Sequence, residues 1–229
     1  MKIEFCIENV QSALAAAKHK ADTVELCSDL NQDGLTPSLE LIKNCKKVYH
    51  GEIHMMIRPR AGDFNYNQAE LNLMKASIIT AHKNNVSGVV FGILNQKKAV
   101  DIEKNKYLLS ISKKLNLKTT FHRAFDSCNH PIKNFNTITK LGFNRILTSG
   151  HENKAIDGLG LIKTLIKNNE SSTQIIAGSG INQNNIAHFC NIGLDGIHFT
   201  IHNKNKIAAD LKYIDQKKIK GVLISINRH

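Results

Sequence analysis

Short apolar runs recur along this chain, spaced about 20 to 30 residues apart, and a helical pattern follows each of them. Proline residues stand where helices are expected to begin, at Pro37 and Pro131, and Gly142 stands where a helix is expected to end. We therefore expect eight strands, at Ile3–Cys6, Thr23–Cys27, Ile53–Arg58, Gly88–Ile93, Thr119–Arg123, Arg145–Ser149, Gln174–Gly178 and Gly196–Phe199.

Alternation of strands and helices predicts a parallel sheet, because a helical crossover returns the chain in the same direction. Eight such units can close on themselves and remove the sheet edges. The length of 229 residues is near the roughly 250 residues typical of this architecture. No linker rich in Pro, Gly or Ser interrupts the pattern. The predicted fold is therefore α/β, a (β/α)8 TIM barrel that forms one domain over residues 1–229.

The first two strands repeat one pattern, in which an apolar residue, Glu, an apolar residue and Cys follow one another. It occurs at Ile3–Cys6 and again at Val24–Cys27. Side chains alternate along a strand, so Glu and Cys share one face, while Phe5 and Leu26 share the other. The outer face of a barrel packs under helices and is apolar. We therefore expect the glutamates and cysteines to point into the lumen and to lie near one another.

The same alternation predicts polar side chains inside the barrel on other strands. Such interiors are usually filled by branched aliphatic residues, and buried charges are costly unless they are paired or functional. We expect a polar site that opens toward the carboxyl ends of the strands. The alternative is a paired ionic core without chemistry, for instance Glu25 against Arg58. The residues expected to face inward are Glu4, Glu25, His54, Met56, Arg58, Thr120, His122 and His198.

The net charge of +12 suggests a nucleic-acid partner only at first sight. Of the 31 basic residues only five are Arg, and the lysines are scattered over predicted helices and loops. A nucleic-acid surface gathers basic residues on one element with aromatic residues nearby, and aromatic residues make up 6% of this chain. We therefore expect no nucleic-acid partner.

The sequence also predicts a cytoplasmic protein. Glu4 interrupts any apolar run at the start, so no signal peptide is expected, and no run of 18 apolar residues predicts a membrane span. Five cysteines without an export signal are expected to be reduced thiols.

Several motifs, in this order, resemble the CutC family of copper-homeostasis proteins: VELC at 24–27, GLTPS at 34–38, IRPRAGDF at 57–64, FHRAFD at 121–126, LTSG at 147–150 and AGSGI at 177–181. The resemblance covers about residues 1 to 200 and implies a (β/α)8 barrel that binds Cu(I) in the cytosol. The chain departs from the family at Ala61, where Gly is usual, in the residues after His198, and in a segment from Asn203 onward that looks shortened.

Cu(I) prefers soft thiolate and thioether ligands. Cys6 and Cys27, at the ends of neighbouring strands, are the expected copper ligands, with Met56 nearby. Cys128, in the loop after the fifth strand, faces the same end and could join them. The alternative is that Cys6 and Cys27 are small residues that fill the barrel.

The alternative function is an enzyme of isomerase or lyase type that acts on a small anionic metabolite, a phosphorylated one included. No spacing identifies a reaction, so the sequence leaves open whether the chain is an enzyme, and its oligomeric state, a homo-oligomer included. A helix expected to begin near Asn182 would add backbone donors to the glycine-rich turn before it. The candidate catalytic residues are Glu25, Arg58, His122, Asp126 and His198, and the candidate anion-binding residues are Arg58, Arg60, Asp63, Arg123, Ser149, Gly178, Ser179 and Gly180.

Overall fold

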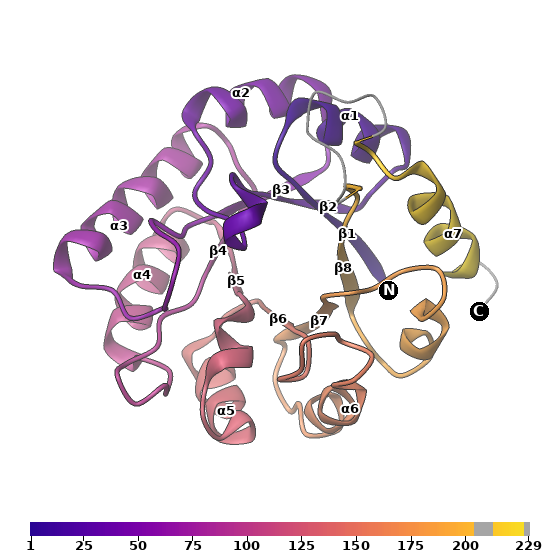
Figure 1. Cartoon of the computed structure of the whole chain (residues 1–229). Coiled ribbons are helices and arrows are strands. Elements are labelled where there is room, and N and C mark those ends of the chain that lie inside the picture. Colours follow the sequence, from indigo (N-terminus) through magenta and orange to yellow (C-terminus); the bar gives the residue numbers. More distant parts are fainter. Residues whose placement is uncertain (204–212, 227–229) are drawn as a thin grey trace.

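The computed structural model of this chain describes residues 1–203 and 213–226. Eight strands pair in parallel in chain order, and β8 closes onto β1, so the sheet is a closed barrel inside a ring of helices (Figure 1). The strands are β1 (Lys2–Ile7), β2 (Thr23–Leu26), β3 (Glu52–Met56), β4 (Gly88–Phe91), β5 (Lys118–Phe121), β6 (Arg145–Thr148), β7 (Gln174–Gly178) and β8 (Gly196–Thr200). The predicted fold class is confirmed.

Helices follow most of the strands, and their ends are set by local signals. Asn67 caps α3 and exchanges hydrogen bonds with Glu70 in a capping box. Pro131 occupies the first turn of α5, and Gly142 ends that helix at φ +80°, as predicted. The helices are α1 (Val10–Lys18), α2 (Leu39–Val48), α3 (Gln68–Lys83), α4 (Ile102–Lys114), α5 (Pro131–Leu141), α6 (Leu159–Lys167) and α7 (Gln216–Ile226), with 3-10 turns η1 (Leu30–Gln32), η2 (Arg123–Ser127) and η3 (Ile186–Phe189).

The helix expected near Asn182 is absent from the described structure, and that prediction is wrong. Only the four-residue turn η3 lies between β7 and β8. In this turn the side chains of Asn182 and Asn185 bond to nearby backbone. Asn185 Oδ1 accepts from the Asn182 amide, Asn182 Oδ1 accepts from the Asn184 amide, and both amide side chains donate to the Gly180 carbonyl. Such bonds satisfy the backbone outside a helix.

The alternation along the strands separates two apolar groups. Phe5 and Leu26 belong to the large core between the sheet and the helices. A second, smaller group of Cys6, Cys27, Met56 and Val90 lies apart from that core, inside the barrel. The strands therefore have the predicted register, with the glutamate and cysteine face turned inward.

The two repeated patterns are not level with each other in the barrel. In the register of β1 with β2, Cys6 is opposite Glu25, whereas Glu4 is opposite Thr23. Closure of a barrel requires such a stagger between strands. Glu25 therefore lies one layer nearer the carboxyl end of the barrel than Glu4. We call the layer around Glu4 the floor and the layer around Glu25 the mouth.

Candidate metal site in the barrel lumen

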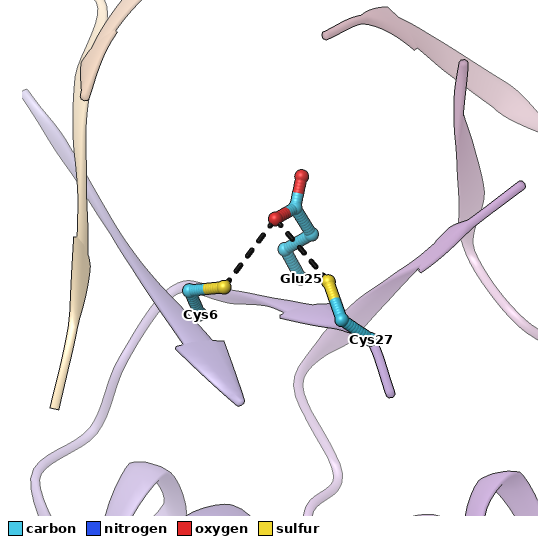
Figure 2. A group of neighbouring side chains, drawn as sticks. All are labelled: Cys6, Glu25 and Cys27. Atoms are coloured by element: carbon cyan, nitrogen blue, oxygen red, sulfur yellow. Dashed lines mark hydrogen bonds between the residues drawn. The ribbon is translucent and has the colours of Figure 1, made fainter. Parts of the chain in front are cut away.

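Two thiols meet one carboxylate at the mouth (Figure 2). Cys6 Sγ and Cys27 Sγ each lie 3.5 Å from Glu25 Oε2, and each thiol donates to it. One ligand atom from each of the three residues lies within 4.8 Å of the others. Across residues 1–203 and 213–226, no other trio of Cys, His, Asp and Glu side chains is gathered this closely. The predicted neighbours Cys6 and Cys27 are thus brought together, with Met56 in the same cluster.

The environment shifts the pKa values of the two thiols in opposite directions. Hydrogen bonding with Cys27 lowers the pKa of Cys6 against the opposing effects of burial and of Glu25. The same interaction, together with burial, raises the pKa of Cys27 well above its ordinary value. The environment therefore favours the thiolate of Cys6 and disfavours that of Cys27.

Cys27 is covered by a glycine of the loop after β2. Gly34 has φ +85°, and a Cβ added there would lie 3.1 Å from Cys27 Sγ. A side chain at this position would be strained by its backbone and would press on the sulfur. Glycine is therefore required for the loop to close over Cys27.

The floor holds a dense ionic network around Glu4. Its Oε2 accepts from Arg145 at 2.7 Å and from Thr23 Oγ1 at 3.0 Å, and its Oε1 lies 2.9 Å from His198 Nδ1. Arg145 also donates to His54 Nδ1 at 2.6 Å. Burial opposes ionisation of Glu4, but Arg145 and His198 outweigh it and hold the pKa of Glu4 well below its ordinary value.

His198 joins the floor to the mouth. Its Nδ1 is bound to Glu4, and its Nε2 lies 3.7 Å from Glu25 Oε2. Burial would lower the pKa of His198, yet Glu25, Cys6 and Glu4 raise it well above its ordinary value. Burial raises the pKa of Glu25, against the attraction of His198. The imidazolium of His198 thus lies between two carboxylates of which Glu4 is the more firmly ionised.

An open cavity of about 1420 Å³ lies above these residues, and it is lined by Cys6, Glu25, Met56 and His198 from the lumen. The loops add further lining residues, among them Arg58, Phe64, His122, Arg123 and Asp126. Cys27 is not part of the lining. The cavity therefore reaches the candidate metal site on the side of Cys6.

The Arg58 side chain joins two loops through hydrogen bonds to their backbone. Its guanidinium donates to the carbonyls of Gln32 at 2.6 Å and Gly34 at 3.3 Å, and on its other side to that of Gly62 at 3.0 Å. These bonds tie the loop after β2 to the loop after β3. Because both terminal nitrogens are engaged, the planar fork expected to hold an anion is used on the backbone instead.

The two other arginines of the predicted anion set are also engaged. Arg60 is paired with Glu70 at 2.5 Å and with Asp63 at 3.0 Å. Arg123 donates to Asp126 at 2.9 Å and to Ser149 Oγ at 3.0 Å. Each guanidinium thus has an internal acceptor.

Asp126 organises the loop after β6. It accepts from Arg123, from the Thr148 hydroxyl, from the backbone and hydroxyl of Ser149, and from the His151 amide. The Ser149 hydroxyl also donates to the Glu152 carbonyl. In the turn Gly178–Gly180, Ser179 Oγ donates to the Asn153 carbonyl. Ser179 and Gly180 both have positive φ and line the cavity.

The structure differs from the sequence-based expectation at Cys128 and at Arg145. Cys128 is outside the thiol pair, and its Sγ lies 3.7 Å from His151 Nε2. Arg145, the partner of Glu4, was not among the expected site residues, although it opens the sixth predicted strand. A charged residue at the start of an otherwise apolar run was the signal that could have indicated it.

Comparison with known proteins agrees with this geometry. The model of the CutC family matches residues 1–203. This chain belongs to the CutC family. A CutC protein of Glaesserella parasuis is 35% identical, over 97% of this chain and 98% of its own length. The human copper homeostasis protein cutC homolog is 39% identical, over 80% of this chain and 67% of its own length.

A solved structure of a CutC protein from Streptococcus agalactiae has the same fold. It superposes with a TM-score of 0.81 at 31% identity, and the match covers 87% of this chain and 98% of that one. The resemblance to the CutC family that the motifs indicated is confirmed. The segment from Asn203 onward, expected to be shortened, lies partly in residues 204–212 and 227–229, outside the described residues. In the described part of the chain, no helix is long and apolar enough to cross a membrane.

Proposed function

We propose that this CutC-family chain takes part in copper homeostasis by binding Cu(I) through the thiols of Cys6 and Cys27 at the mouth of the barrel. The observation that carries the proposal is the meeting of both sulfurs at one carboxylate oxygen, each 3.5 Å away. Copper homeostasis is also the role named for the human relative.

The chemistry of the donor set fits Cu(I). Soft sulfur ligands select this ion over hard divalent cations, and Met56 adds a thioether to the same cluster. The lowered pKa of Cys6 favours the thiolate that a metal requires. Glu25 accepts a hydrogen bond from each thiol. It is therefore the group that would accept a proton when a metal replaces the thiol protons.

The site suits a reducing compartment, and we place this function in the cytosol. All five cysteines are free, and four of them are buried. Free buried thiols are typical of reduced proteins. An enzyme acting on an anionic metabolite is the less supported alternative, because the arginines expected to hold the anion are bound to backbone or to carboxylates.

Anaerobic titration with Cu(I), in competition with a chromophoric Cu(I) chelator, tests the proposal. We expect one ion per chain and a fall in affinity of at least tenfold in Cys6→Ser and in Cys27→Ser, because each variant loses one of two soft ligands. X-ray absorption at the copper edge should report sulfur ligation in the wild type and a reduced sulfur count in both variants.

Cys45→Ser is the matched control. Cys45 is a fully buried thiol of α2 on the outer side of the barrel, so this change removes a thiol of equal burial far from the lumen. Its Cu(I) affinity should equal that of the wild type. Equal affinity in Cys6→Ser and Cys27→Ser, or equal loss in Cys45→Ser, would contradict the proposed site.

A further inference from the structure

One polar atom at the cavity plays no part in copper binding. His122 caps the 3-10 turn η2, and its Nδ1 accepts from the Ala124 amide at 3.2 Å. Burial, with Arg58 nearby, lowers the pKa of His122 to about 3, so the ring is neutral near pH 7. A neutral ring whose Nδ1 is an acceptor carries its proton on Nε2. His122 therefore offers an N–H donor, and a protonated nitrogen is not a metal ligand.

That donor has no partner. His122 is 4% exposed and lines the cavity, and its Nε2 is buried without a hydrogen bond. A buried donor without a partner is energetically unfavourable, and a bound acceptor would satisfy it. The ring of Phe64, 4.9 Å from that of His122, adds an apolar wall beside the donor.

Glu25 supplies an unpaired acceptor in the same cavity. Its Oε2 receives the two thiols, while its Oε1 is buried without a hydrogen bond. A ligand that fills both needs must accept from His122 and donate to Glu25. A carbonyl oxygen and a hydroxyl group in one small molecule meet those requirements.

The charges around the cavity favour an uncharged ligand. Among the described residues that line it, five carboxylates, Glu8, Glu25, Asp33, Asp126 and Glu152, face two arginines, one lysine and the His198 imidazolium. The arginines are already bound to carbonyls or to Asp126. No excess of positive charge is left to attract an anion.

We propose that the cavity binds a small neutral hydroxy-carbonyl compound, of the size and class of a short ketose, whose carbonyl oxygen accepts from His122 Nε2. This binding goes beyond copper, because its donor lies outside the thiol pair and it does not require either cysteine. The volume of about 1420 Å³ is far more than a single ion occupies.

Two matched pairs of probes test the proposal by NMR: dihydroxyacetone against glycerol, and erythrulose against erythritol. Each pair differs by one carbonyl group. With the histidine side chains labelled with ¹⁵N, the Nε2–H resonance of His122 should shift saturably with each ketose. It should not shift with the corresponding alcohol. The starting spectrum also reports the Nε2–H tautomer directly.

Two variants separate the donor from the fold. His122→Asn keeps an acceptor near the position of Nδ1 for the Ala124 amide but removes the donor, and we expect at least a tenfold loss of ketose affinity. His122→Gln places an amide N–H near the position of Nε2 and should retain more of the affinity. Saturation-transfer NMR follows the ligand in both, and thermal melting checks that each variant is folded.

The double variant Cys6→Ser/Cys27→Ser distinguishes this proposal from the copper site. Ketose binding should stay within about twofold of the wild type there, even where Cu(I) binding is lost. Equal binding of ketose and alcohol, undiminished binding in His122→Asn, or binding of glycolate and phosphate alone would each overturn the proposal. Absence of any response to both ketoses would overturn it as well.

Discussion

Glu4 and Glu25 stand in the same four-residue pattern on neighbouring strands, yet their surroundings differ. Both oxygens of Glu4 are bound, to Arg145 and Thr23 on one side and to His198 on the other. Glu25 receives two thiols on one oxygen and nothing on the other. The environment lowers the pKa of Glu4 and raises that of Glu25.

This difference follows from one layer of height in the barrel. The stagger of β1 against β2 sets Glu4 at the floor, opposite Thr23, and Glu25 at the mouth, opposite Cys6. At the floor Arg145, Thr23 and His198 all bind Glu4, and between them they engage both of its oxygens. At the mouth, the Glu25 carboxylate faces the cavity and the thiols of Cys6 and Cys27. The two carboxylates therefore differ in one respect: both oxygens of Glu4 have partners, whereas one oxygen of Glu25 has none.

Removal of Glu4 should have the largest effect on stability. Glu4→Ala leaves Arg145 and His198 buried without their carboxylate, and breaking a buried pair in this way costs about 3–5 kcal/mol. Urea unfolding followed by circular dichroism measures the loss. A loss below about 1 kcal/mol would show that the floor network does not stabilise the fold.

Acid should destabilise the protein through His122 at a higher pH than through Glu4. The unfolded chain binds a proton at His122 near pH 6.5, whereas the folded chain does so only near pH 3. Stability from this group is present above pH 6.5 and falls, by up to about 1.4 kcal/mol per pH unit, as pH drops toward 3. The Glu4 contribution is lost only below its ordinary value of 4.5, because its folded pKa is lowered.

Comparison of the wild type with His122→Asn isolates the mouth. Unfolding free energies at pH 6.5 and 5.5 should differ less in the variant, because it lacks the titrating ring. His202, whose pKa burial lowers to about 4, contributes to both proteins equally and cancels. The same pH slope in both proteins would contradict the assignment of a buried neutral ring to His122.

Replacement of Glu25 should have the smallest effect on stability. Glu25→Gln keeps an oxygen acceptor for the thiols and removes a charge that burial already disfavours. We expect a change within about 1 kcal/mol in urea unfolding. A loss as large as that of Glu4→Ala would abolish the distinction between floor and mouth.

The sequence predicted the barrel and its inward face because period-two alternation is a local property. Phe5 and Leu26 had to face the helices, and this placed Glu4, Glu25 and the cysteines inside. The height of each residue in the barrel depends on the stagger between strands, which no single strand encodes. The partnership of Glu4 with Arg145, 141 positions later in the chain, could therefore not be read from either strand.

The loops were predicted less well for a related reason. Arg58 was expected to hold an anion, but it binds carbonyls of Gln32, Gly34 and Gly62, and every residue type carries a carbonyl. After β7 a helix was expected, but the chain forms a turn in which asparagine side chains bond to the backbone. His122 was predicted to face the site, but its tautomer depends on a hydrogen bond from the Ala124 amide, which the strand pattern does not indicate.

Because the loop at Gly34 covers Cys27, the thiol pair faces the cavity on the side of Cys6. The loop that closes over Cys27 blocks that sulfur, while Cys6 remains in the wall of the cavity. In the proposed copper function, an ion that arrives through the cavity would therefore meet Cys6 before Cys27.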